Sequence, residues 1–416
     1  MTSSLLSQSG FYFLTCEVPV ILRRLLWPIV LCAALAATNR YAGPPLTRDF
    51  NPGDAFFYYA IAEAAPALAD ETLYFHHAQR LAAPYVVGLL HRAAPIPLHD
   101  VFRAAVLLLM LAILLVSQSV LEQLALHRRQ AGVILGALAL NPWVFRPYLT
   151  FPEMIPDLAF VLGTALMLRG LAAGRGRDVL IGQLVASLGR QTGLLLVPMA
   201  AAWIWRDREV WGRIAARRRA GYAIASAGLA GSVYLATGAV AASFSFPSDN
   251  AEHLYGMVLW LATMFDPAVL AEFLTRAALP PLLGTGLILG LGRRAWLAGR
   301  ASDLAPVLAF GSLCIWAQPI LGGPEITGPT VIRLVAIGVL PLLVLLGTAL
   351  HASGAFAAAA SGPRLAGVWA LVAIGSLHHA YVFTGMPSER DRLLFVAVYV
   401  LASAGCAAIA AREVRR

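Results

Sequence analysis

The stretch VFRAAVLLLMLAILLVSQSVLE, residues 101–122, decides the fold class because only two of its side chains are charged. A helix of about 20 apolar residues is long enough to cross the hydrocarbon core of a bilayer. Similar runs recur along the 416-residue chain, which is 59% hydrophobic and 13% charged, against about 25% charged residues in soluble domains. Ala, Leu and Gly dominate these runs without strand-like alternation, so the sequence predicts membrane-spanning helices rather than a β-barrel.

The arginines indicate how these helices are oriented. All 31 basic residues are arginines, and they fall in short clusters between the apolar runs, as the positive-inside rule describes for cytoplasmic segments. Placing the clusters in the cytoplasm assigns 20 arginines and 7 carboxylates to that side, and 11 arginines and 15 carboxylates to the other. We therefore attribute the net charge of +9 to membrane topology and expect no nucleic acid partner. Both termini are predicted to be cytoplasmic.

We expect a single all-α, polytopic integral-membrane domain over residues 1–416, with about 11–13 transmembrane or half-transmembrane helices. The first span, near 25–40, is predicted to be an uncleaved helix, because no convincing signal-peptide cleavage site accompanies it. A large first outer loop at 40–100 contains two short helices predicted to lie in the membrane surface. A second large outer loop covers 242–276. The arginine-only, alanine-rich usage is typical of a GC-rich bacterial genome, which places the chain in a bacterial cytoplasmic membrane.

The segment DVLIGQLVASLGRQTGLLLVPMAAAWIW, residues 178–205, is too long for one crossing and too short for two. We expect a hairpin of two short helices broken around Gly189–Gly193, since broken helices occur at membrane depth where they line a cavity. Arg190 would then lie at the tip, toward the outer leaflet. An arginine buried there is a functional candidate; the alternative is an arginine that reaches ordinary lipid headgroups.

Four short motifs give a resemblance to a known family. They are GD-x-x-x-YY at Gly53–Tyr59, R-L-x-x-P at Arg80–Pro84, LGRQTGLLLVP at 188–198 and GPTVIRLVAIGVLP at 328–341. With the large first outer loop, this layout resembles the GT-C superfamily of integral-membrane glycosyltransferases, which use polyprenyl-phosphate sugars. The resemblance implies a GT-C-like fold, a catalytic acidic residue in the first outer loop, and substrate binding near Tyr58. One departure is that many relatives have a pair of acidic residues, whereas Asp54 has no adjacent acid.

Asp54 is our candidate catalytic base. Transfer from a lipid phosphate requires a base for the acceptor hydroxyl and cations for the departing phosphate. A carboxylate can serve as the base if desolvation raises its pKa toward working conditions. The alternative is that Asp54 caps the N-terminus of its helix. Asp49 is the second candidate, while Asp70 and Glu71 are expected at a solvated loop edge.

Arg80, Arg190 and Arg333 are candidate phosphate ligands, because a guanidinium group binds phosphate oxygens in a bidentate manner. Each could instead reach lipid headgroups or pair with a loop carboxylate. His76 is a further candidate for binding phosphate or sugar. The pairs His76-His77 and His378-His379 leave a divalent metal possible, but no third ligand follows from their spacing, so we assign no metal residues.

The leading interpretation is a glycosyltransferase that moves a sugar from a polyprenyl-phosphate donor to an acceptor at the outer face of the cytoplasmic membrane. The acceptor, whether glycan, lipid or protein, is not identified by the sequence. One alternative is a transporter or lipid-carrier flippase, which predicts inverted repeats and polar residues near the middle of several spans; we find no convincing repeat. Another is a non-catalytic subunit of an envelope-assembly complex on the same scaffold.

Overall fold

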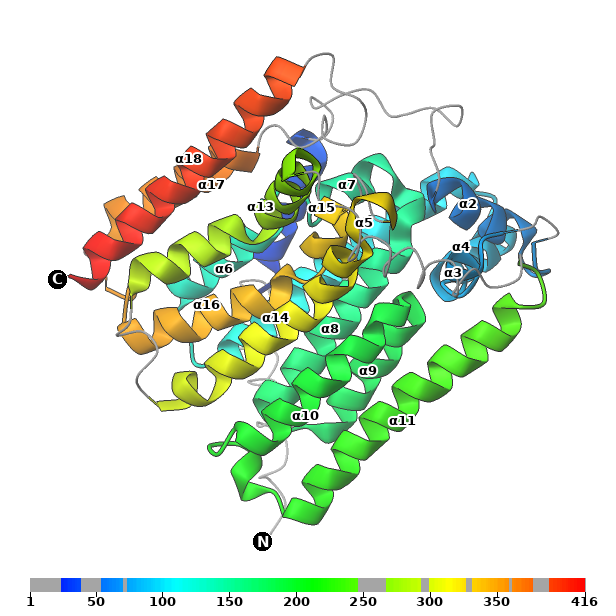
Figure 1. Cartoon of the computed structure of the whole chain (residues 1–416), viewed down its shortest axis with the longest axis horizontal. Coiled ribbons are helices and arrows are strands. Elements are labelled where there is room, and N and C mark those ends of the chain that lie inside the picture. Colours follow the sequence, from blue (N-terminus) through cyan, green and yellow to red (C-terminus); the bar gives the residue numbers. More distant parts are fainter. Residues whose placement is uncertain are drawn as a thin grey trace, which may run out of the picture.

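The computed structural model describes residues 24–38, 54–69, 73–245, 267–292, 299–326, 331–358, 361–376 and 389–415, without the side chains of 321–326 and 389–392. Across these residues the chain is helical (Figure 1), and the one β-type contact is an isolated bridge between Leu73 and Ser245. Asp49, Asp70, Glu71, most of the expected second loop and His378-His379 lie outside the described residues.

Six of the described helices are long and apolar enough to cross a membrane, as the sequence predicts for a polytopic protein. They are Leu98–Gln123 (α5), Pro152–Ala173 (η2, Pro152–Met154, with α8, Ile155–Ala173), Ala216–Ala241 (α11), Pro267–Leu291 (α13), Arg300–Ile320 (in α14, Gly299–Ile326) and Leu393–Val414 (in α18, Glu389–Val414). Two shorter apolar helices are Arg24–Thr38 and Val339–Ser353 (α16).

The remaining helices are shorter. They are α2 (Asp54–Ala64), α3 (Phe75–Ala78), α4 (Ala82–Ala93), α6 (Arg128–Ala139), α7 (Arg146–Thr150), α9 (Gly176–Gly189), η3 (Gln191–Leu195), α10 (Leu196–Arg206), η4 (Trp211–Arg213), α15 (Val331–Ala336) and α17 (Gly362–Ser376). The first outer loop therefore contains α2, α3 and α4, and the 178–205 segment contains most of α9, η3 and α10.

Two helix boundaries differ from the expectation. Residues 267–276, expected in a loop, form the start of α13, where Glu272 and Arg276, one helical turn apart, form an ion pair along the helix. The expected span at 331–350 is two helices, α15 and α16, separated at Ile337–Gly338. At this break the Val335 carbonyl accepts from the Gly338 N–H over 3.0 Å and from the Trp316 indole N–H over 3.1 Å.

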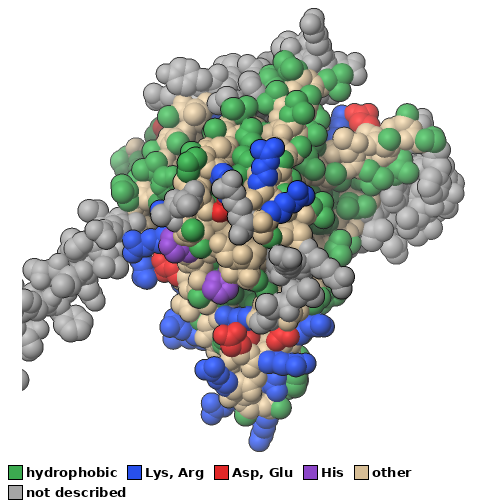
Figure 2. All heavy atoms as spheres, turned by 90° about the vertical axis from the view of Figure 1, so that its left-hand side faces the viewer, with side chains coloured by type: hydrophobic (Ala, Val, Ile, Leu, Met, Phe, Trp, Pro, Cys, Tyr) green, Lys and Arg blue, Asp and Glu red, His purple; other side chains and the backbone are tan. Residues whose placement is uncertain are grey.

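Charge is distributed unevenly over the molecule. Arginine side chains gather at the narrow lower end of Figure 2, and apolar side chains cover the faces above it. In Figure 1 the connection between α10 and α11 lies at the lower end, whereas α2, α3, α7 and α15 lie in the upper part. That connection is the arginine-rich segment WRDREVWGRIAARRR. The polar elements of the first outer loop thus lie away from the arginine-rich end.

The helices α8 and α9 pack with their backbones in close contact, and glycines make this possible. A Cβ atom at Gly163 of α8 would collide with the backbone of Ala186 on α9, and one at Gly182 of α9 would collide with the backbone of Met167 on α8. Small residues allow this approach between helices in membranes, where van der Waals packing drives association. The closely packed α8–α9 pair thus supports the residues at the start of α8 and at the end of α9.

Candidate functional site

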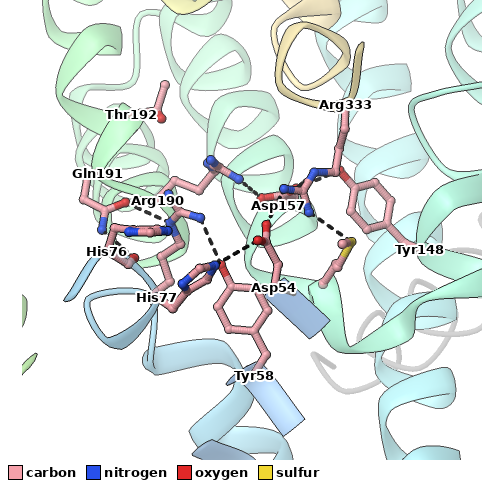
Figure 3. Close-up of polar contacts among 12 residues, drawn as sticks. Asp54, Tyr58, His76, His77, Tyr148, Asp157, Arg190, Gln191, Thr192 and Arg333 are labelled. Carbon is pink, nitrogen blue, oxygen red and sulfur yellow. Dashed lines mark hydrogen bonds and ion pairs between the residues drawn. The ribbon is translucent and has the colours of Figure 1, made fainter. Parts of the chain in front are cut away.

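Asp54 and Arg333 form the centre of a polar network that joins distant parts of the chain (Figure 3). The Arg333 side chain donates from Nη2 to Oδ2 of Asp54, as an ion pair. The other carboxylate oxygen, Oδ1, lies 2.9 Å from Nε2 of His77. Asp54 is the first residue of α2, His77 belongs to α3, and Arg333 belongs to α15. Two helices of the first outer loop are therefore joined to a helix near the end of the chain.

Asp157, at the start of α8, is the second carboxylate of this network. It pairs with Nη1 of Arg190, and its Oδ2 lies 3.6 Å from Nε of Arg333. The hydroxyl of Tyr148 donates to the same oxygen over 3.2 Å. Figure 3 shows Asp157 between the two guanidinium groups. One buried carboxylate thus holds two arginines that come from different halves of the sequence.

The packing of Gly189 explains why Arg190 reaches Asp157. A Cβ atom at Gly189 would lie 2.5 Å from the Phe160 nitrogen and 2.8 Å from the Pro156 oxygen, so only glycine fits between α9 and the first turn of α8. The next residue, Arg190, leaves the helix with extended backbone, φ −152° and ψ 149°. Its side chain therefore starts beside the helical turn that contains Asp157.

Arg80 connects the first outer loop to the tip of the hairpin. Its Nη1 donates to the Tyr58 hydroxyl over 3.0 Å, and its Nε donates to Oε1 of Gln191 over 2.9 Å. The Gln191 amide also donates to the His76 carbonyl and to Oε1 of Gln79, over 2.9 and 2.8 Å. Among the described residues no carboxylate lies within ion-pair distance of Arg80. Arg80 is therefore a buried cation held by neutral groups.

We define the charged cluster as the two carboxylates and three guanidinium groups of this network. Its members are Asp54, Asp157, Arg80, Arg190 and Arg333. With His77 neutral, the cluster has one positive charge in excess, which favours the binding of an anion. The Asp54 side chain is 24% exposed, whereas those of Arg333 and Asp157 are 3% and 2% exposed. Asp54 is thus the carboxylate that an incoming molecule can reach.

The pKa of Asp54 moves in the direction opposite to our expectation. Burial by itself would raise it, but the Arg333 guanidinium and the His77 hydrogen bond outweigh burial and hold the pKa well below its usual range. Burial lowers the pKa of His77, so its imidazole is neutral near pH 7 and donates from Nε2. The expectation that desolvation raises the pKa of Asp54 is wrong, because the contacts with Arg333 and His77 outweigh burial.

Two further expectations concern His76 and the start of α2; the role of His76 in binding phosphate or sugar stays a prediction, and the capping role of Asp54 needs correction. The residue that contacts Asp54 is His77, whereas the His76 ring packs against Tyr74 and His77, with centroids 6.0 and 4.0 Å apart. The capping alternative for Asp54 also differs from the geometry, because its carboxylate is bound by His77 and Arg333, and within the described residues it accepts no hydrogen bond from the α2 backbone.

The charged cluster does not suit a divalent metal. In the described part of the chain no group of three or more His, Cys, Asp or Glu residues could hold one. The Asp54 and Asp157 oxygens that a metal would use are bound by arginine, and a nearby cation opposes a second one. We therefore assign no step to a metal ion.

The structure brings together Asp54, Tyr58, Arg80, Arg190 and Arg333, five of the residues singled out in the sequence. Sequence reasoning missed Asp157 and Gln191, and it considered His77 only with His76 as a possible metal ligand. Asp157 had a signal, since it follows the outer segment NPWVFRPYLTFPEMIP and begins a span with a carboxylate, which is rare at membrane depth. Gln191 lies inside the LGRQTGLLLVP motif, but the sequence analysis assigned it no role.

Comparisons with protein-family models, curated proteins and solved structures gave no match.

Proposed function

We propose that the chain is a membrane glycosyltransferase that moves a sugar from a polyprenyl-phosphate donor to an acceptor at the outer face of the cytoplasmic membrane. The observation that supports this most is the direct contact between Asp54, a partly exposed carboxylate, and Arg333. Asp54 supplies a base, and the three arginines of the charged cluster supply a site for the departing phosphate.

In this proposal the reaction is carried by these side chains and the two substrates. The acceptor oxygen bonds to the anomeric carbon of the sugar as the bond from that carbon to the phosphate oxygen breaks. The bonding electrons leave with the polyprenyl phosphate, whose charge Arg80, Arg190 and Arg333 neutralise, and the hydroxyl proton passes to Asp54.

Substrate binding also provides a way to activate Asp54. A phosphate that binds Arg333 competes with Asp54 for the guanidinium group, which weakens the contact that holds the pKa of Asp54 low. The proton affinity of Asp54 then rises when the donor is in place. The base is thus inactive without substrate, and becomes effective beside the phosphate that the arginines bind.

The location of the cluster supports the outer face. It lies among α2, α3, α7 and α15, away from the arginine-rich connection between α10 and α11 (Figure 1). By the positive-inside rule the arginine-rich end faces the cytoplasm. Donor and acceptor would therefore meet on the opposite side.

The test is transfer by the purified full chain in lipid nanodiscs, with labelled polyprenyl-phosphate hexoses and pentoses and a panel of membrane acceptors. Asp54→Asn should abolish release of polyprenyl phosphate, because an amide cannot accept the proton. Asp100→Asn is the matched control, since Asp100 is half exposed and pairs only with Arg103 one turn away.

The same preparation separates the alternatives. A flippase would move the labelled carrier across the bilayer of a proteoliposome without breaking the sugar–phosphate bond. An envelope-assembly subunit would do neither. Either result, obtained with a donor and acceptor panel on which a known transferase is active, refutes the proposal.

A further inference from the structure

A further buried arginine lies outside the charged cluster, and no carboxylate of the described residues lies within ion-pair distance of it. Arg146, in α7, is 2% exposed. Its Nη2 donates to the hydroxyl of Ser376, at the end of α17, over 2.9 Å. Its other two guanidinium nitrogens, Nε and Nη1, are buried without any hydrogen-bond partner. Burial lowers the pKa of Arg146 only to about 10, so the side chain stays charged at neutral pH.

The other buried arginines of the described residues show what is missing. Arg190 and Arg333 pair with carboxylates, and the partly buried Arg300 pairs with Asp207 over 2.7 Å. Arg80 pairs with no carboxylate of the described residues, but both its Nε and its Nη1 have an acceptor, Gln191 and Tyr58. Burying a guanidinium group without a partner costs much more than burying an ion pair. Within the described part of the chain Arg146 has neither a carboxylate nor enough acceptors. An anion from outside the chain would complete its coordination.

Arg146 also points away from the charged cluster. Tyr148, two residues further along the same short helix, reaches Asp157 on α8, whereas Arg146 reaches Ser376 on α17. Successive helical residues are about 100° apart, so these two side chains leave α7 in nearly opposite directions. The guanidinium group of Arg146 is therefore a separate position for an anion.

We propose that Arg146 and Ser376 bind the phosphate group of a membrane lipid. A guanidinium group with two free donors matches phosphate oxygens in a bidentate manner, and the serine hydroxyl is a further polar contact. Trp143, Val144 and Phe145, just before Arg146, are buried inside the protein, whereas Ile374, two residues before Ser376 on α17, is an apolar side chain that is 47% exposed. A lipid fits this setting better than free phosphate, because its chain stays in apolar surroundings while its headgroup reaches the arginine. The site stands independently of the glycosyltransferase proposal.

The first test is the thermal stability of the full chain in detergent, depleted of lipid. Arg146→Met should raise the melting temperature, because replacing an uncompensated buried charge by an apolar side chain of similar length removes its desolvation cost. Added undecaprenyl phosphate should raise the melting temperature of the wild type and remove the difference in melting temperature between the wild type and Arg146→Met. A fall in melting temperature, or failure of the variant to fold, would mean that the chain itself neutralises Arg146 and would overturn the proposal.

The second test counts bound lipids by native mass spectrometry. Arg146→Met should retain one undecaprenyl phosphate fewer than the wild type, while undecaprenol, which lacks the phosphate, should bind equally to both. The number of lipids bound by Arg80→Gln reports on the charged cluster alone. Loss of lipid from the charged cluster can therefore be distinguished from loss at Arg146. Arg146→Lys should retain less than the wild type, since an ammonium group lacks the bidentate geometry. An unchanged count in Arg146→Met, or a response to inorganic phosphate alone, overturns the lipid site.

Discussion

Arg333 and Asp54 form an ion pair although 279 positions separate them in the sequence. The pair closes the network between the first outer loop and α15, and it holds the carboxylate of Asp54 in its ionised form. The same guanidinium group also faces Asp157. Arg333 is thus shared between an accessible carboxylate and a buried one, and the variants below separate these two contacts.

Asp157→Asn should strongly destabilise the protein. The change leaves Arg190 without its ion-pair partner and weakens the second contact of Arg333, and removing one member of a buried pair costs about 3–5 kcal/mol. Thermal unfolding of the full chain in detergent measures this loss. Asp178→Asn is the matched control, because its partner Arg169 is 33% exposed, and its loss should cost less than about 1 kcal/mol. Equal effects of the two variants would contradict the structural role given to Asp157.

Arg333→Lys should reduce sugar transfer by on the order of 100-fold, the usual effect of losing one donor that stabilises developing negative charge. Lysine keeps the charge but loses the planar group that contacts both Asp54 and Asp157. Steady-state kinetics with a labelled donor in nanodiscs give the measurement. The glycosyltransferase mechanism is wrong if the variant keeps wild-type activity.

The stability of the protein should fall as the pH decreases below 6.5, partly because of His77. Burial lowers its pKa from 6.5 in the folded state, so below that pH the unfolded chain binds a proton that the folded chain does not. The free energy of unfolding then drops by up to about 1.4 kcal/mol per pH unit from this residue. Above pH 6.5 both states are neutral and the full contribution is present.

His77→Gln isolates this effect. Glutamine keeps a donor for Asp54 but does not titrate, so unfolding measured between pH 8 and pH 5 should depend less on pH than in the wild type. The comparison at pH 8 corrects for any loss of packing. Identical slopes for the two proteins would show that His77 is not held neutral by burial.

Gly189→Ala should disturb the position of Arg190. The new methyl group would lie 2.5 Å from the Phe160 nitrogen, and the backbone of α9 must move away from α8 to accommodate it. We expect a lower melting temperature and weaker retention of undecaprenyl phosphate by the charged cluster. Gly228→Ala, on α11, is the control, because nothing lies within 4 Å of its added Cβ. That variant should be neutral or stabilised by up to about 1 kcal/mol.

The helical membrane architecture followed from the sequence because hydrophobic length is a local property. Residues 101–122 are apolar for long enough to cross a bilayer whatever else the chain contains, and the structure has α5 at Leu98–Gln123. The helix break at Gly189–Gly193 could also be predicted from the sequence, since a segment of 28 residues between arginine clusters is too long for one membrane crossing and too short for two. The structure has α9 end at Gly189, followed by η3 and α10.

The candidate arginines and Asp54 could also be predicted from the sequence, because charged side chains are rare in a hydrophobic chain and are therefore functional candidates. The residues that they contact could not be predicted from the sequence. Asp157 joins Arg190 and Arg333 only because α8, α9 and α15 pack against one another, and His77 rather than His76 meets Asp54 because of the direction in which α3 turns. The direction of the Asp54 pKa likewise depends on a contact across 279 positions.

The sequence by itself thus determined that the chain is helical, with helices long and apolar enough to span a membrane, and which charged residues are candidates for function, because length, hydropathy and charge act over a few helical turns. Tertiary structure alone decided which charges are paired, that the Asp54 carboxylate is held ionised, and that Arg146 meets no carboxylate among the described residues. The physical reason is that electrostatic interactions in a low-dielectric interior depend on distances of a few Å between side chains, and packing sets those distances between residues far apart in the chain.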